Sequence, residues 1–209
     1  MNSKVAAMAL VITILLISVY SNGNLKSVKG QINIWKKYSD PGQKFSFLYP
    51  PSWLIKSMHD NITGTTSVIL GNPNSSRAQV SILYNPNEAL LISPTGKPVT
   101  PSRALKNMEK EISADFIFFN STGQFPHKYS IQKYQSASDV VDYEKSNGKP
   151  GKMLIVFTKV NDKDSFVITY SDSKRLFYKN LSNVSQIIKS IDSNYRMNVR
   201  CRDYFNPSS

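Results

Sequence analysis

The sequence predicts an α+β fold, an α/β/α sandwich in which a central antiparallel sheet is flanked by helices. Three observations predict it: short apolar runs are bounded by turn residues, a helix start occurs in mid-chain, and a strongly amphipathic segment follows the last run. With 40% hydrophobic and 11% aromatic residues, the 209-residue chain has the composition of a globular protein. Its only cysteine, Cys201, excludes a disulfide framework and a cysteine-based zinc site.

Strands are predicted on both sides of the mid-chain helix. In the first half, residues 45–49 alternate in polarity until Pro50 and Pro51 end the strand. Two further runs, 67–70 and 78–84, are closed by Gly-Asn-Pro and Asn-Pro and predict an antiparallel pair. The second half reads as a meander of strand-like runs with turns at Asn147-Gly148 and at residues 161–164. These runs are residues 129–134, 139–144, 153–160 and 165–170.

Two helices are predicted to cover the sheet. The first begins at Thr100 and Pro101, a hydroxyl cap followed by proline at the first helical position, and ends near Ala114. Residues 116–119 then continue apolar into a loop over residues 120–126. The second helix follows residues 171–173. The buried stripes are expected to contain Leu105, Met108 and Ile112 in the first helix, and Phe177, Leu181, Val184, Ile188 and Ile191 in the second.

The N-terminus predicts export from the cytoplasm. Lys4 precedes an uncharged apolar stretch over residues 5–20, so residues 1–23 are either a cleaved signal peptide or an uncleaved N-terminal membrane anchor. Both alternatives place the protein outside the cytoplasm, secreted or anchored to the outer face of the cell membrane. A linker over residues 24–37, a domain over 38–193 and a flexible basic tail over 194–209 are expected to follow.

Asn-x-Ser/Thr sequons agree with export, although an Asn- and Ser-rich chain also produces them by chance. Asn61, Asn74 and Asn120 lie in expected loops and are the candidate glycosylation sites. Asn180 and Asn183 fall inside the second predicted helix, where a glycan is not expected.

The formal charge of +12 is interpreted as a solvated, mildly basic surface, which by electrostatic steering favours contact with an anionic partner over nucleic acid. Basic residues are spread along the chain without a run of five like charges, an Arg-rich helix or a nucleic-acid-binding motif. An anionic membrane surface or an acidic protein fits this pattern better. Arg196, Arg200 and Arg202 in the tail are the candidate electrostatic contacts.

No catalytic residues and no cofactor are predicted. The two histidines, His59 and His127, lie far apart in polar segments, and phosphate-loop, dinucleotide and nucleophile-elbow motifs are absent from the sequence. Asp142 and Glu144 share one face of a predicted strand, while Asp162 and Asp164 share a turn. These four carboxylates are candidate calcium ligands, but neighbouring lysines favour a polar turn and a solvent-facing strand instead.

Residues 42–53, which read Gly-Gln-Lys-Phe-Ser-Phe-Leu-Tyr-Pro-Pro-Ser-Trp, resemble the opening signature of PsbP-like domains. Residues 165–171 and the helix closing over 187–191 resemble that family's last strand and last helix. The resemblance covers residues 38–193, is to the non-photosynthetic prokaryotic type, and implies the sandwich predicted above. Its signature residues are interpreted as markers of the fold rather than of a function: Phe45, Phe47, Tyr49, Pro50, Trp53 and Tyr170.

The resemblance implies a binding role, since the family's founding member is an extrinsic subunit that helps photosystem II retain calcium and chloride. Calcium is therefore implied here by resemblance alone, and no metal or docking residue of the family is matched. We interpret the chain as a non-catalytic extracytoplasmic binding or assembly module that supports a protein complex near the membrane. One alternative is a hydrolase with a sheet pocket that encloses Asp142 or Glu144 beside a histidine. Another is a photosystem II-type extrinsic subunit with a calcium-linked role.

Deleting residues 194–209 is expected to weaken binding to anionic lipid vesicles and to leave the fold intact, because this tail lies beyond the last amphipathic helix. Salt is expected to weaken binding in the same way, since the screening length is about 8 Å at physiological ionic strength. Vesicle co-sedimentation measures both effects. Binding that survives both the deletion and about 0.5 M salt would contradict the electrostatic account.

Overall fold

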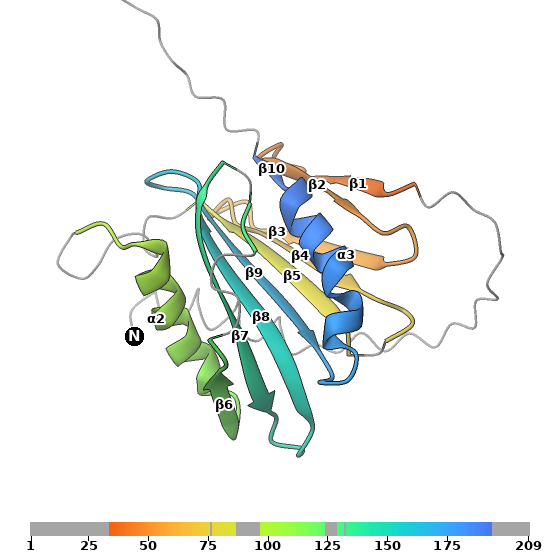
Figure 1. Ribbon diagram of the computed structural model, residues 1–209. Helices are drawn as coiled ribbons and strands as arrows, with labels where there is room; N and C mark the ends of the chain where they lie inside the picture. Colours follow the sequence, from red (N-terminus) through yellow and green to blue (C-terminus); the bar gives the residue numbers. More distant parts are fainter. Residues whose placement is uncertain (1–33, 76, 87–96, 124–128, 132, 194–209) are drawn as a thin grey trace, which may run out of the picture.

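A seven-stranded antiparallel sheet forms the centre of the fold in the computed structural model, which describes residues 34–75, 77–86, 97–123, 129–131 and 133–193 (Figure 1). Its strand order is β3-β4-β5-β9-β8-β7-β6. Every neighbouring pair in it is antiparallel. The strands are β3 (Leu54–His59), β4 (Thr66–Gly71), β5 (Gln79–Asn85), β6 (Phe118–Ser121), β7 (Gln135–Glu144), β8 (Pro150–Lys159) and β9 (Ser165–Asp172).

The two faces of this sheet are covered by different elements (Figure 1). Helix α2 (Pro101–Ser113) lies on one face, against β7 and β8. Helix α3 (Phe177–Ser190) lies on the other face together with a second, three-stranded sheet of order β1-β2-β10. The strands of that sheet are β1 (Lys36–Ser39), β2 (Phe45–Tyr49) and β10 (Asp192–Ser193). The predicted α/β/α sandwich is confirmed, and the second sheet is an addition to it.

Alternation along the strands divides the buried side chains between two cores. In β8, Leu154 and Val156 face α3 and the small sheet, while Ile155 and Phe157 face α2. Central strands buried on both faces read as continuous apolar runs, which is why β8 and β9 were predicted from sequence. Each helix stripe is buried as predicted, and the Thr100 hydroxyl accepts a hydrogen bond from the Arg103 N–H at the start of α2.

Aromatic packing joins the small sheet to the central one. The ring of Phe45 on β2 meets the ring of Phe166 on β9 edge to face at 5.2 Å between centroids, and Tyr84 on β5 lies 5.6 Å from Phe45. Helix α3 also contacts the small sheet: at its C-terminal end, the Ser190 hydroxyl accepts a hydrogen bond from the Leu48 N–H of β2 at 2.9 Å. Strand β2 and helix α3 are therefore held as one layer against the sheet.

The structure differs from the sequence-based predictions at four places. Residues 129–134 are not a strand: Tyr129 and Ile131 are buried alternately, but the chain turns at Lys133, whose φ is 77°. The segment expected to begin a loop at Asn120 instead continues strand β6. Strand β3 was not predicted at all, and β1 includes Lys36 and Lys37, at the end of the expected linker.

Neither helix in the described part of the chain has the length and apolar character needed to cross a bilayer. The apolar stretch at residues 5–20 lies outside the described residues, so the export prediction stays a prediction.

A fully buried carboxylate, Asp172, stands at the junction of β9 and α3. Its Oδ1 accepts hydrogen bonds from the Ser173 N–H at 2.7 Å and the Ser75 hydroxyl at 3.1 Å. Its Oδ2 accepts from the Asn180 amide at 3.1 Å and the Tyr170 hydroxyl at 3.2 Å. A buried charge is tolerated only when it is hydrogen-bonded in this way.

The same network extends to the loop after β4. The Asn72 amide donates to Oδ1 of Asn180 at 3.2 Å, and the single Tyr170 hydroxyl proton is shared between Asp172 and the Phe177 carbonyl, whose oxygen lies 3.0 Å from the hydroxyl. Burial and then the charge of Asp172 raise the pKa of Tyr170 well above its ordinary range, so this hydroxyl remains a donor. Strand β9, helix α3 and the loop after β4 thus share one set of hydrogen bonds.

We expect Asp172→Ala to lower the free energy of unfolding by about 3 kcal/mol, because the substitution leaves several buried donors without an acceptor. Asp172→Asn should cost less, since one acceptor oxygen remains. Urea denaturation with a constant m value measures both changes. Equal stability of the wild type and the Asp172→Ala variant would show that this network does not hold α3 to the sheet.

Helix α2 brings a second carboxyl group close to β7. Burial, followed by the charge of Asp139 and its hydrogen bond, raises the pKa of Glu109 to about 7 against the opposing charge of Lys106. The folded protein therefore retains a proton that the unfolded chain releases near pH 4.5. The resulting stabilisation is complete at lower pH and is lost as the pH rises through about 7.

Glu109→Gln is expected to remove this pH dependence. Partial contact with solvent screens the repulsion between the two carboxylates, so the gain in stability at about pH 8 should be on the order of 1 kcal/mol, with almost none at about pH 5. Thermal unfolding of the two proteins across this range measures the difference. A difference that does not change with pH would be inconsistent with a shared proton.

Candidate functional site

A polar pocket of about 310 Å³ lies between the turn after β2, the loop after β4 and the first turns of α3. The turn contributes Pro50, Pro51, Ser52 and Trp53, so part of the aromatic and proline signature lines a hollow as well as the core. Trp35, just before β1, forms another part of the wall. The chain has two tryptophans, and both lie at this pocket.

The buried hydrogen-bond network described above supports the inner wall of the pocket. Asn180 and Ser75 both line it and both donate to the Asp172 carboxylate. Asn72 lines it too and is held by Asn180. Because these side chains are fixed by the β9–α3 junction, the pocket wall is preorganised.

The remaining polar side chains of the pocket lining are unpaired within the part of the chain that the structure describes. Asn74, Asn183, Ser52 and Lys179 line the pocket, and their side chains make no hydrogen bond or ion pair with the residues that the structure describes. Asn74, Ser52 and Lys179 are exposed and Asn183 is half-buried. The pocket therefore presents amide, hydroxyl and ammonium groups that are available to a ligand.

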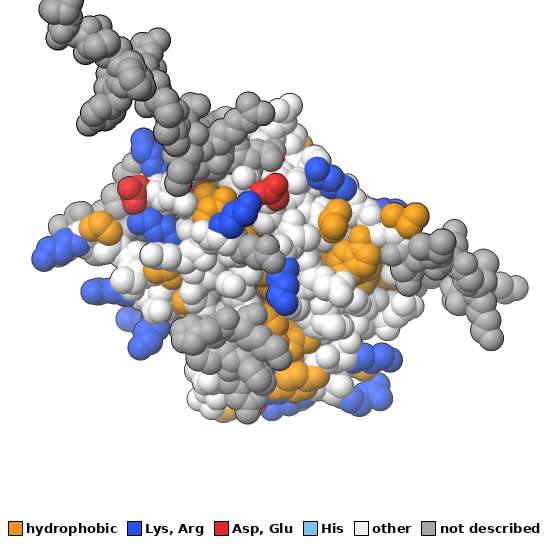
Figure 2. Space-filling model, turned by 45° about the horizontal axis from the view of Figure 1, so that its top comes forward, with side chains coloured by type: hydrophobic (Ala, Val, Ile, Leu, Met, Phe, Trp, Pro, Cys, Tyr) orange, Lys and Arg blue, Asp and Glu red, His pale blue; other side chains and the backbone are white. Residues whose placement is uncertain are grey.

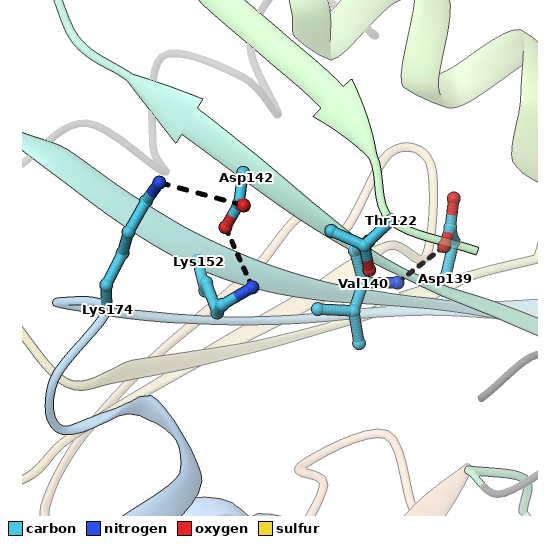
Figure 3. Close-up of polar contacts among 6 residues, drawn as sticks. All are labelled: Thr122, Asp139, Val140, Asp142, Lys152 and Lys174. Carbon is cyan, nitrogen blue, oxygen red and sulfur yellow. Dashed lines mark hydrogen bonds and ion pairs between the residues drawn. The ribbon is translucent and has the colours of Figure 1, made fainter. Parts of the chain in front are cut away.

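The Asp142 carboxylate on β7 forms ion pairs with two lysine side chains (Figure 3). Its Oδ1 lies 2.8 Å from the Lys152 ammonium, and its Oδ2 lies 3.6 Å from the Lys174 ammonium. Burial lowers the pKa of Lys152, but the hydrogen bond and charge of Asp142 outweigh that effect and the net shift is upward. Two lysines therefore already neutralise the carboxylate expected to bind calcium.

Of the other predicted calcium ligands, two already contact neighbouring side chains and the third lies at the end of a strand. Asp162 pairs with the Lys159 ammonium at 2.8 Å, and Asp164 accepts a hydrogen bond from the Asn161 amide at 2.6 Å. Glu144 lies at the end of β7, on the same face as Asp142. No group of three or more potential metal ligands occurs in the ranges that the structure describes.

His59 belongs to a structural relay at the end of β3. The Thr66 hydroxyl donates to Oδ1 of the buried Asp40 at 2.8 Å, so the His59 Nδ1–H donates to the Thr66 oxygen, also at 2.8 Å. The Thr66 hydroxyl is fully buried and donates its proton to Asp40, so this hydroxyl cannot contact a substrate. Four strands separate β3 from β7 in the sheet, so His59 is not beside Asp142. His127 lies outside the described residues.

The family-signature side chains are packed as fold residues. Phe45, Phe47, Tyr49, Pro50, Trp53 and Tyr170 are all buried. Among the candidate glycosylation sites, Asn61 and Asn74 are exposed in turns, and Asn120 is exposed in β6 rather than in a loop. Asn180 is 9% exposed and hydrogen-bonded, so its amide is inaccessible to a glycosylating enzyme. Arg196, Arg200 and Arg202 lie outside the described residues.

Strand β3 is an exposed edge of the central sheet. Among the described strands it pairs with β4 alone. Leu54, Lys56 and Met58 point to one face of it, and the two apolar members are each 48% exposed. In the turn that follows, Ile62 is 96% exposed. We call these four residues the β3 edge surface.

On the face that Figure 2 presents, the described basic side chains are spread out instead of forming one patch. Figure 2 shows lysines and arginines separated by neutral and hydrophobic areas on the face that it presents. This distribution agrees with the sequence, in which no long run of like charges occurs. The formal charge of +12 thus acts on a partner as a diffuse field.

No protein-family model matches this chain, and the search of curated proteins finds no match. Solved structures do match it. The solution structure of cyanobacterial PsbP (CyanoP) from Synechocystis sp. PCC 6803 is 14% identical, covers 82% of this chain and 99% of its own, and gives a TM-score of 0.50. The Ran-binding protein Mog1p of Saccharomyces cerevisiae is 10% identical, with coverage of 77% and 96% and a TM-score of 0.47.

LpqN of Mycobacterium tuberculosis, described as involved in cell envelope biogenesis, is 14% identical, with coverage of 76% and 91% and a TM-score of 0.43. At such low identity a likeness carries information on the fold alone. The match to cyanobacterial PsbP confirms the fold implied by the signature at residues 42–53: this chain has a PsbP-like fold.

Proposed function

We propose that this chain is a non-catalytic, extracytoplasmic binding and assembly module that acts near the membrane surface in support of a protein complex. The observation that carries the proposal is the β3 edge surface, Leu54, Lys56, Met58 and Ile62, which leaves apolar side chains exposed beside an edge strand. An edge strand presents N–H and C=O groups that a partner strand can pair with, and the exposed side chains add apolar contact.

Lys56 gives this edge a preference among partners. A lysine between two apolar side chains discourages two copies of the chain from pairing edge to edge, because like charges would then face each other. The same lysine, within the diffuse positive field of the protein, favours a partner whose edge is acidic. An acidic protein partner is therefore the occupant that we propose for the β3 edge surface.

The absence of an enzymatic role is also part of the proposal. In the described part of the chain, Asp142 and Asp162 are paired with lysines, Glu109 and Asp139 are paired with each other away from a histidine, and His59 serves a structural relay. The extracytoplasmic position is supported by the predicted export segment at residues 1–23 and by the exposed sequon at Asn61. No observation in the described ranges favours the hydrolase or the photosystem II alternative.

Affinity recovery of the tagged full chain from its native membranes in mild detergent tests this function. We expect a specific partner to be recovered with the wild type, and the Leu54→Lys/Met58→Lys double variant to lose most of it because added charges oppose burial of this edge. Leu48→Lys is the matched control, since Leu48 is 40% exposed on β2 and lies outside the β3 edge surface. The intact mass of the same preparation reports whether residues 1–23 have been removed.

Two outcomes would overturn the proposal. Recovery of no specific partner would remove the assembly role. Recovery of the same partner by the wild type and the double variant would show that the β3 edge surface is not its binding site.

A further inference from the structure

The pocket between the turn after β2 and helix α3 is separate from the β3 edge surface and calls for a ligand of its own. We propose that it binds a saccharide, as a second binding site beyond the proposed assembly role. The argument rests on the pocket's aromatic walls, its unused neutral polar groups and its charge.

The tryptophan in the outer part of the wall, Trp35, suits the apolar face of a sugar ring because it is only half-buried. Trp35 and Trp53 both line the pocket, and their indole N–H groups make no hydrogen bond with the described residues. The face of an indole ring carries negative charge density, which attracts the slightly positive C–H groups on one face of a pyranose. Trp35 is half-buried and can offer part of its ring face, whereas Trp53 is buried in the core and can contribute to the site only through its N–H group.

The free polar groups suit hydroxyls. Asn74 and Asn183 each supply an amide that both donates and accepts, and Ser52 supplies a hydroxyl that does the same. Neighbouring sugar hydroxyls also donate and accept, so one hydroxyl can accept a hydrogen bond from the amide NH₂ group while the next donates one to the amide oxygen. An apolar ligand would leave these groups unpaired, at a cost to its affinity.

Charge argues against an anion or a cation. Lys179 is the one charged side chain among the residues that line the pocket. Behind the wall, the buried Asp172 carboxylate lies 3.1 Å from the Asn180 amide and offsets that positive charge. Phosphate recognition normally uses several cationic groups or a forked arginine. A volume of about 310 Å³ is near the lower limit for ligand pockets and admits a small sugar unit.

Tryptophan fluorescence provides a direct assay because both tryptophans lie at the site. The unglycosylated full chain would be titrated with maltotriose, cellotriose and chitotriose, and saturation-transfer NMR would report contact with each sugar. We expect a saturable change with at least one of them, at a dissociation constant of about 1 mM or lower. Inorganic phosphate serves as the anionic probe.

The Asn74→Ala/Asn183→Ala double variant is expected to weaken that binding about tenfold or more, since two hydrogen bonds are lost. These amides have no partner in the described residues, so the variant should unfold like the wild type. Asn107→Ala, on the exposed face of α2, is the matched control and should bind normally. Binding unchanged in the double variant would overturn the site.

A saturable response to phosphate with none to the sugars, or no response to any probe, would overturn the saccharide assignment. Neither result bears on the assembly role, because partner recovery depends on the β3 edge surface.

Discussion

The burial of one carboxylate, Asp172, constrains the whole α3 side of the molecule. An ionised group with no exposed surface must have all its acceptor positions filled, and here the donors come from β9, from α3 and from the loop after β4. If any of those three elements moved away, the buried Asp172 carboxylate would lose hydrogen-bond donors. The first turns of α3 are consequently held at the sheet, although the Leu176 cap position provides no side-chain hydrogen bond to the helix.

That constraint also produces the pocket. Asn180 faces Asp172 with its amide nitrogen and Asn72 with its oxygen, so the residues that stabilise the junction also form the inner wall of a hollow. On the opposite side, the turn over residues 50–53 is held because β2 packs its aromatic face on β9 and β5. The signature that identifies the fold therefore has a second consequence. It places the buried Trp53 in the wall of the pocket, beside the half-buried Trp35.

The two proposed binding surfaces differ in chemistry because they arise from different parts of the architecture. The β3 edge surface is largely apolar and extended, and it exists because β3 is a terminal strand of an open sheet. The pocket is concave, polar and flanked by tryptophans, and it exists because a helix meets two loops over a buried charge. The carboxylates of β7 contribute to neither, since Lys152 and Lys174 already pair with Asp142.

The sequence by itself determined the helices and strands that are marked by a pattern of neighbouring residues. Strands β8 and β9 are apolar on both faces, α3 has an uninterrupted apolar stripe, and α2 begins at a hydroxyl followed by proline. Strand β3 escaped prediction because an exposed edge strand shows no clear alternation. Residues 129–134 resembled a strand in sequence because Tyr129 and Ile131 are buried alternately, but the described residues of this segment belong to no strand.

The tertiary structure alone decided the second sheet, the burial of Asp172 and the pocket. Strand β10 contains two residues and exists only through its pairing with β2, almost 150 positions earlier in the chain. The pocket combines residues near positions 35, 50, 74 and 180, and its one sequence signal was the presence of both tryptophans near the domain's N-terminal end. Periodicity and capping are properties of neighbours in sequence, whereas pairing, desolvation and concavity depend on contacts that only the folded chain makes.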